Sequence, residues 1–303
     1  LNMADLAERL PPVAESRAVL VSFAFISVGV LLKLALFPLH LWLPNAYTYA
    51  PSMVSAFLAA TATKVAAYVL LRFLYSVFKL DKVIGDIPLD IVLVTLAVIA
   101  MFAGSTVAVF QENLKRMLAY SSVAQIGYIV LGISFLNAPG VTASILHLFN
   151  HAMMKGGMFL ALGCVVYRIG SVHIKDFSGI GHRMPWTTAA FIVGGLSLIG
   201  VPLTVGFISK WYLVLGAIDR GWWPVGLLIL ASSLIAVIYI WRVVETAYFK
   251  PAPENAKDID EAPAAMLLPT WILIGASIYF GIDTSLTVSV AEQATTTLIG
   301  GVN

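Results

Sequence analysis

The sequence predicts an all-α integral membrane protein with about eight transmembrane helices, two of them discontinuous. Sixty per cent of the 303 residues are hydrophobic, only 11% are charged, and the mean hydropathy is +0.92. Soluble domains carry roughly 25% charged residues. Apolar windows of about 20 residues, each able to cross a ~30 Å hydrocarbon layer as a helix, recur along the chain. A β-barrel would show short alternating segments instead, which excludes that class of membrane protein.

The apolar windows and the loop signals between them define eight expected spans. In order, these are residues 18–38, 51–74, 88–110, 116–136, 141–168, 186–217, 223–249 and 264–281. Residues 1–17 form a polar segment that lacks the apolar core of a signal peptide. The stretch "KPAPENAKDIDEAP" predicts a polar loop at 250–263, and residues 282–303 form a C-terminal tail. Because the chain begins with Leu1 rather than methionine, we expect it to be part of a longer polypeptide.

Helix-breaking residues interrupt the first and the sixth of these spans. A proline removes one helical hydrogen bond, and in a membrane the freed carbonyl must meet a protein group or water in a cavity. Such carbonyls can stabilise a buried ammonium, and a lysine accompanies each break; the alternative is a simple packing kink. The breaks are at Pro38, after Lys33, and at Gly200, Pro202 and Gly206, before Lys210.

Four lysines lie inside the expected spans: Lys33, Lys64, Lys155 and Lys210. An ionisable group at bilayer depth costs at least about 2.5–3.5 kcal/mol on insertion scales, so such residues usually serve a function. The alternative is snorkelling, in which the lysine stem follows apolar surface until its ammonium reaches the interface. None of the sixteen acidic residues is in the middle of an expected span, so these lysines have no obvious carboxylate partner there.

His147 and His151 precede Lys155 at spacings that keep all three residues on one helix face. Buried lysine and histidine can both exchange protons with internal water near neutral pH. We therefore expect a proton relay made of Lys33, Lys64, His147, His151, Lys155 and Lys210. The fourth span also contains a polar stretch, which comprises Tyr120, Ser121, Ser122, Gln125 and Tyr128. We prefer the interpretation that these residues form hydrogen bonds between helices; the alternative is that they line the relay.

No cofactor or metal is expected. Two histidines four residues apart could hold zinc only with at least a third ligand, and no carboxylate or cysteine cluster lies near them. The single cysteine, Cys164, cannot hold an iron–sulfur cluster, and haem would need an opposed histidine. With a net charge of +2 and no basic arm, nucleic acid is not an expected partner.

Four motifs resemble a known family. The stretches "LLKLALFPLHLWLPNAYTYAPSMVSAFLAATATKVAAYVLLRF", "NLKRMLAYSSVAQIGYI", "LHLFNHAMMKGGMFL" and "GVPLTVGFISKWYLV" are similar to the antiporter-like subunits of respiratory complex I, membrane-bound hydrogenases and Mrp-type antiporters. Within this family, the chain looks most like the D-type subunits of Mrp sodium/proton antiporters. The resemblance implies a fourteen-helix fold of two inverted five-helix repeats, of which this chain holds the C-terminal part.

The resemblance also implies a role for each segment. Residues 18–74 would be the last two helices of the first repeat, 88–249 the second repeat, and 264–281 the final transmembrane helix. Lys33 and Lys210 would be the lysines of the two broken helices, Lys64 the connecting lysine, and Lys155 with His147 and His151 the central relay. The glutamate that pairs with the first of these lysines in the family lies on a helix that this sequence lacks.

The leading hypothesis is a proton-translocating subunit of a multisubunit sodium/proton antiporter, which moves protons along a hydrated Lys/His axis at mid-membrane. Such a subunit is not itself an enzyme, and its partners are other membrane subunits of a hetero-oligomer, protons, sodium and the lipids of a cell inner (plasma) membrane. The alternative is a proton-pumping membrane-arm subunit of an NADH:quinone oxidoreductase or membrane-bound hydrogenase. A third possibility is a scaffold whose lysines only snorkel.

Overall fold

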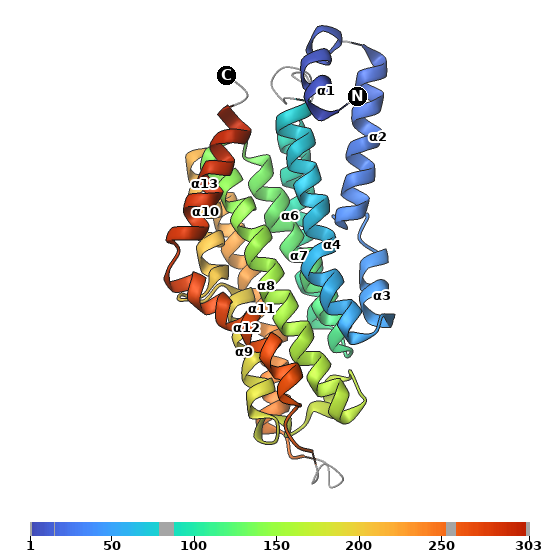
Figure 1. Ribbon diagram of the computed structural model, residues 1–303, viewed down its shortest axis with the longest axis vertical. Helices are drawn as coiled ribbons and strands as arrows, with labels where there is room; N and C mark the ends of the chain where they lie inside the picture. Colours follow the sequence, from blue (N-terminus) through green and yellow to red (C-terminus); the bar gives the residue numbers. More distant parts are fainter. Residues whose placement is uncertain (1, 15, 79–87, 253–258, 301–303) are drawn as a thin grey trace.

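The computed structural model describes residues 2–14, 16–78, 88–252 and 259–300, and most of its helices follow one long axis (Figure 1). Within these described ranges, seven helical segments are long and apolar enough to cross a membrane, so the chain is a multi-pass membrane protein. They are α2 (Arg17–Leu34), α4 (Ser52–Leu71) with its π-helical extension η2 (Arg72–Val77), α6 (Leu89–Val109), α7 (Leu114–Ser134), α8 (Ala138–Ile169), α11 (Trp223–Phe249) and α12 (Ala264–Ile282). The predicted all-helical membrane class is confirmed.

The sixth expected span consists of two shorter helices, as the sequence predicts. Helix α9 (Pro185–Ile199) ends at Gly200, whose φ of 92° is left-handed, and α10 (Val205–Asp219) begins after Pro202. Gly206 then brings α10 against the end of α9, because a Cβ at this position would lie 1.7 Å from the carbonyl oxygen of Ser197. The backbones of the two half-helices therefore meet at a place that only glycine allows.

The first expected span is broken in a similar way. Helix α2 ends at Leu34, Pro38 follows in the connection, and α3 (Trp42–Tyr49) continues the chain. The residue after each first half is left-handed, Ala35 (φ 63°) in one break and Gly200 in the other. Each break also closes with a bond from an amide to the carbonyl five residues earlier, Leu36 to Leu31 and Val201 to Leu196, both 3.1 Å. This Schellman-type ending satisfies the carbonyls of Leu31 and Leu196 within the backbone.

Helix α7 lies at the centre of the bundle and is buried along its length. Helices α6 and α8 pack along it, and α8 in turn contacts α4, α9, α10 and α12. Small residues permit this close packing: a Cβ on Gly127 of α7 would lie 2.7 Å from the carbonyl oxygen of Ala97 of α6. Many polar groups on α7 and α8 are therefore buried against protein, among them Ser121, Gln125, His147 and Asn150.

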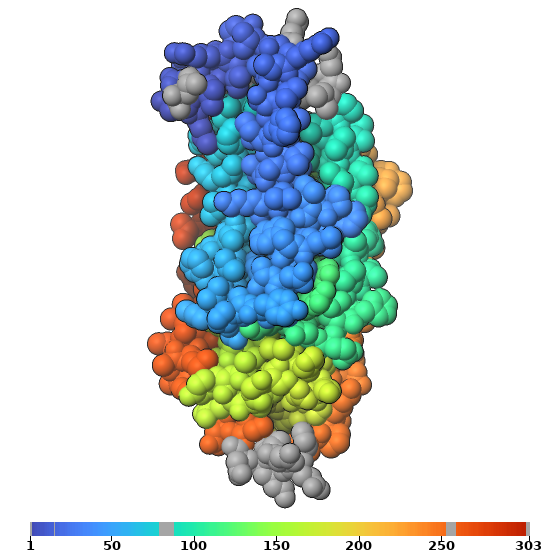
Figure 2. Space-filling model, turned by 90° about the vertical axis from the view of Figure 1, so that its right-hand side faces the viewer, coloured from blue at the N-terminus to red at the C-terminus, as the bar shows by residue number. Residues whose placement is uncertain are grey.

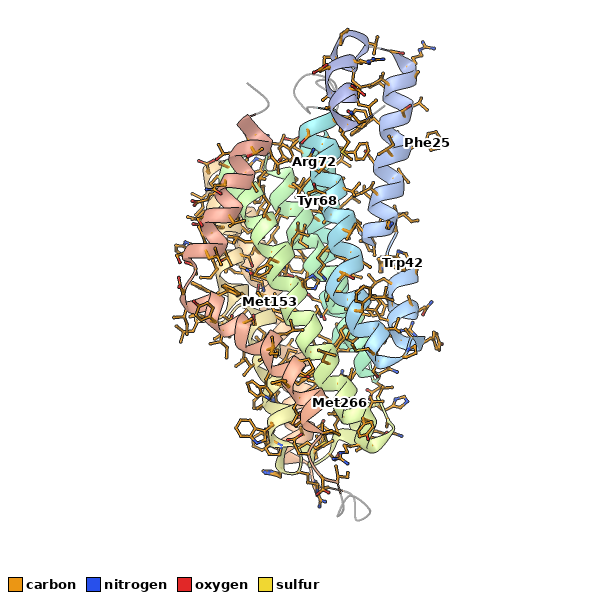
Figure 3. All side chains as sticks on the ribbon, in the orientation of Figure 1. Phe25, Trp42, Tyr68, Arg72, Met153 and Met266 are labelled. Atoms are coloured by element: carbon orange, nitrogen blue, oxygen red, sulfur yellow. The ribbon has the colours of Figure 1, made fainter. Side chains whose placement is uncertain are left out.

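Helices α2 and α3 form an outer layer at the right edge of the bundle in Figure 1, over α4. This layer faces the viewer in Figure 2. Phe25 of α2 points away from the bundle (Figure 3) and is 76% exposed. The outer side of α2 is thus free to contact lipid or protein outside the described chain.

The remaining segments contain more helix than the sequence indicated. The N-terminal polar segment holds α1 (Met3–Arg9) and the short helix η1 (Pro11–Val13), and the expected C-terminal tail contains α13 (Ser285–Gly300), which packs on α8. Two further short helices, η3 (Ile174–Phe177) and η4 (Ile180–His182), lie between α8 and α9. The expected polar loop at 250–263 falls partly outside the described residues.

Candidate functional site

Helix α8 carries three of the predicted residues into the interior. His147, His151 and Lys155 are all buried, with exposed fractions of 3%, 0% and 0%. The rings of the two histidines stack at a centroid distance of 5.9 Å and an interplanar angle of 14°. The i, i+4, i+8 spacing thus places the three side chains in one continuous row inside the bundle.

Lys155 is held by neutral oxygen atoms of α7. Its Nζ donates to the carbonyl of Leu118 at 2.9 Å and also to the hydroxyl of Ser121. Two ion pairs of the described chain, Arg220–Asp90 and Arg242–Glu112, involve other residues. A fully buried lysine without a carboxylate partner is costly as a fixed charge, which favours a group that exchanges its proton.

His147 bridges two helices through both ring nitrogens. Its Nε2 lies 2.9 Å from Oε1 of Gln125 on α7, and its Nδ1 lies 2.7 Å from Oγ of Ser209 on α10. Because the amide oxygen of Gln125 can only accept, Nε2 is the donor in that pair. His147 therefore connects the central helix to the second half of the broken helix.

His151 has no hydrogen-bond partner among the described residues at either ring nitrogen. The hydroxyl of Tyr239 and Oδ1 of Asn150 are likewise buried and unpaired there. Buried polar groups are almost always hydrogen-bonded, to protein or to internal water. This part of the row is therefore suited to contact with water.

Lys210 lies where α9 ends and α10 begins. Its Nζ donates to the carbonyls of Leu198 at 3.0 Å and Ile199 at 2.8 Å, and to Oγ of Ser233 at 2.8 Å. Pro202 is four residues after Leu198 and has no N–H, so it cannot supply the helical bond to that carbonyl. The break thus provides the acceptors for a buried ammonium.

Tyr128 of α7 lies between Lys210 and His147. The Nζ of Lys210 is 4.8 Å from the centre of the Tyr128 ring, and the rings of Tyr128 and His147 are 5.8 Å apart. The phenol hydroxyl is 3.0 Å from Oγ of Ser232 and 3.3 Å from Oγ of Ser233. The site at the break and the row on α8 therefore share one aromatic neighbour.

Lys64 joins the row from α4, which packs on α8. Its side chain is half-buried, and its Nζ donates to the carbonyl of Ala59. One turn earlier on α4, Cβ of Ala60 lies 3.5 Å from where a Cβ on Gly156 would stand, and Gly156 directly follows Lys155 on α8. Three helices, α4, α8 and α10, thus bring five of the six predicted relay residues together around α7.

Lys33 is the predicted relay residue that the structure does not bring into this row. It lies on the exposed side of α2, one residue before the end of that helix. Its ammonium has no hydrogen-bond or ion-pair partner among the residues described. Pro38, the break expected near it, lies in the connection between α2 and α3.

Sequence reasoning missed Ser209 and Ser233, the hydroxyl partners of His147 and Lys210. A serine inside an apolar helix is common and gives little signal by itself, although Ser209 directly precedes Lys210. The polar stretch of α7 fits both of its interpretations. Gln125 and Tyr128 make hydrogen bonds between helices, and both also contact the row.

Comparison with known proteins gives a family match over most of the chain. The profile of the family described as "NADH:quinone oxidoreductase/Mrp antiporter, TM" matches residues 1–238. The chain is also 45% identical, over 285 residues, to NADH-quinone oxidoreductase subunit N of Desulforudis audaxviator. That alignment covers 90% of this chain and 56% of the relative, so the chain spans about half the length of the curated relatives it matches.

Two solved structures resemble the fold closely. A chain of the Mrp complex from Dietzia sp. DQ12-45-1b superposes with a TM-score of 0.88 at 24% identity, covering 99% of this chain and 64% of that one. At this identity the likeness concerns the fold alone. A chain of the archaeal membrane-bound sulfane sulfur reductase, a respiratory membrane complex, gives 0.85 at 31% identity and covers 100% and 62%.

Proposed function

Because the chain belongs to the NADH:quinone oxidoreductase/Mrp antiporter transmembrane family, we propose that it translocates protons as a membrane subunit of a redox-driven complex. The observation that carries the proposal is the buried row from Lys155 through the two histidines to Lys210. Its lysine ammoniums contact carbonyl and hydroxyl oxygens rather than carboxylates of the described residues. Such groups can gain and lose protons without leaving a permanent ion pair behind.

The electrostatics of the row favour movement of charge along it. Burial and mutual repulsion between Lys64, Lys155 and the histidines oppose several charges at once. A proton that arrives at one end therefore favours release of a proton further along. Water that contacts the unpaired nitrogens of His151 would connect Lys155 to His147, which meets α10 through Ser209.

The redox-driven assembly is better supported than the sodium/proton antiporter that the sequence favoured. The relative that is 45% identical is named as a subunit of an NADH-quinone oxidoreductase, whereas the Mrp chain is 24% identical and shares the fold. In this proposal the electron carriers are held by other subunits. The chain itself acts as a translocase subunit, and sodium is not part of its cycle.

We assign Lys33 to proton translocation as well, and this assignment rests on the family resemblance. It lies next to a broken helix, as in the resemblance, but on the outer face of the described chain. In the proposed assembly, protein outside the described residues covers this face and pairs with the ammonium. Its contribution would then depend on those neighbouring segments.

The test uses the complete complex in membrane vesicles, with Lys155→Ala and Lys210→Ala made separately. Electron transfer is started with a redox donor, and proton uptake is followed with a pH-sensitive dye. Both variants should lose most of the uptake while the complex still assembles. The control is Lys175→Ala, at an exposed lysine in η3; this variant should retain proton uptake. Uptake at the control level in both lysine variants would refute the proposal.

The antiporter hypothesis is separated by a second measurement on the same vesicles. A sodium gradient is imposed without any electron donor. A sodium-driven pH change that requires Lys155 would favour the antiporter over the redox-driven complex. We expect none.

A further inference from the structure

The three N–H donors of the Lys210 ammonium all have partners. Two are carbonyl oxygens, of Leu198 and Ile199, and the third is the hydroxyl oxygen of Ser233 on α11. Lys210 is 6% exposed and Ser233 is 8% exposed, so bulk solvent has little access to either. Every hydrogen-bond donor of the charged lysine therefore has an acceptor at this site.

The neutral amine has different requirements. It keeps two N–H donors and gains a lone pair, which needs a hydrogen-bond donor when buried. A carbonyl oxygen carries no hydrogen and cannot meet that need. Of the three hydrogen-bond partners of Nζ, Ser233 is the one that can both accept and donate.

The contacts around Ser233 allow its hydroxyl to reverse. Its Oγ now lies 3.0 Å from the carbonyl of Ile229, one turn earlier in α11, and donates to it. Tyr128 places its hydroxyl 3.3 Å from the same Oγ, and its ring faces the ammonium at 4.8 Å. The phenol now donates to Ser232; by turning its hydrogen from Ser232 to Ser233, it can keep Ser233 hydrogen-bonded after the serine has turned its own hydrogen towards Nζ.

The same pairing recurs at Lys155, the buried lysine of α8. Ser121 of α7 donates to the carbonyl of Leu118 at 2.9 Å, and its hydroxyl is contacted by Nζ of Lys155. Leu118 also accepts directly from that lysine. A serine hydroxyl and a helix carbonyl thus meet the ammonium at both positions.

We propose that Ser233 is the reversible hydrogen-bond partner that holds Lys210 in both its charged and its neutral form, a role that rests on the proposed translocation function. One Nζ–H bond first turns from Ser233 to an internal water molecule and then breaks, so that the proton passes to this water and the electron pair stays on the nitrogen. The amine then turns until its lone pair faces Ser233. Ser233 then gives up its bond to Ile229 and donates to the neutral amine. When a proton returns, the hydroxyl accepts again and the ammonium is restored.

The experiment compares two adjacent serines in the complete complex. Ser233→Ala removes the reversible partner of Lys210. Ser232→Ala is the matched control, because Ser232 is also buried and also contacts Tyr128 but makes no hydrogen bond to Lys210. Ser233→Thr restores a hydroxyl at the same position. The rate of proton uptake is measured against pH for all three variants.

Ser233→Ala should lower the rate of proton uptake by about tenfold or more, which corresponds to ~1.4 kcal/mol. Ser232→Ala should keep most of the proton uptake. Ser233→Thr should recover a large part of the lost uptake, and its pH profile should match that of the unmodified complex. Equal rates in the two alanine variants, or no recovery by threonine in an assembled complex, would overturn the inference.

Two further outcomes are informative. If Ser233→Ala prevents assembly, Ser233→Cys tests the same role, because a thiol fills the space but is a weak hydrogen-bond donor and acceptor. Proton uptake at the unmodified level in Ser233→Cys would refute the role of the hydroxyl. If Lys210→Ala itself translocates normally, the proposed function fails, independently of Ser233.

Discussion

The Nζ of Lys210 donates a hydrogen bond of 3.0 Å to the carbonyl of Leu198, which would otherwise require an amide at Pro202. The carbonyl of Ile199 completes the pair at 2.8 Å. The helix break and the buried lysine therefore form one structural unit, in which the break supplies the acceptors that the ammonium needs. A continuous helix would direct both carbonyls to its own backbone.

This unit depends on close contact between the two half-helices at Gly206. We expect Gly206→Ala to reduce the amount of assembled protein strongly, because the added methyl carbon would overlap the carbonyl oxygen of Ser197. The amount of folded subunit in purified membranes measures the effect. The control is Gly275→Ala in α12, where nothing lies within 4 Å of the added atom. That variant should be neutral or stabilising by about 0.5–1 kcal/mol. Equal tolerance of the two substitutions would contradict the contact.

The two histidines of α8 should respond differently to replacement. His151 makes no hydrogen bond to a described residue, whereas His147 binds Gln125 and Ser209. His151→Leu should abolish most proton uptake with little change in melting temperature. His147→Leu should lower both the uptake and the melting temperature, because it leaves the buried amide oxygen of Gln125 unpaired, at a cost of about 1–3 kcal/mol. A large loss of stability in His151→Leu with uptake intact would exclude its place in the relay.

The helix breaks and the row on α8 could be predicted from the sequence because each rests on local chemistry. Proline removes an amide wherever it stands in a helix, and Pro202 follows Gly200 closely, so the two together favour a break. Proline alone is not sufficient, because Pro269 stands inside the continuous helix α12. The spacing of His147, His151 and Lys155 is likewise a property of one helix. These features needed no information about neighbouring elements.

Features that depend on contacts between distant segments could not be predicted in this way. Nothing near Ser233 in sequence indicates that it meets Lys210, since α10 and α11 bring them together only in the fold. Lys33 was expected in the relay because it lies in an apolar span, but exposure depends on which face of α2 is covered. The helix α13 was missed because threonine and serine lower the apolar signal of residues 285–300.

Glu261 should stabilise the first half of the broken helix. Its carboxylate accepts from the amide of Trp186 at 2.8 Å and from the hydroxyl of Thr187 at 2.5 Å, at the N-terminus of α9. A carboxylate at this position satisfies free amides and complements the helix dipole. We expect Glu261→Ala to cost about 0.5–2 kcal/mol of stability, measured as a lower melting temperature. Glu245→Ala, at an exposed acidic residue of α11, is the control and should show no such loss.

Arg242 of α11 should stabilise the turn between α6 and α7 mainly through its bonds to carbonyls. Its guanidinium donates to the carbonyls of Val109 and Gln111 and to the carboxylate of Glu112 at 3.1 Å. The side chain of Glu112 is 70% exposed, so the ion pair by itself contributes at most about 1 kcal/mol. Glu112→Gln should therefore change the melting temperature little.

Arg242→Lys should lower that temperature clearly, since one ammonium cannot reproduce the planar fork of donors that reaches all three acceptors. Thermal unfolding of the purified complex at low and high salt distinguishes the two contributions. A large, salt-sensitive effect of Glu112→Gln, equal to that of Arg242→Lys, would mean that the ion pair rather than the carbonyl contacts holds α11 to this turn.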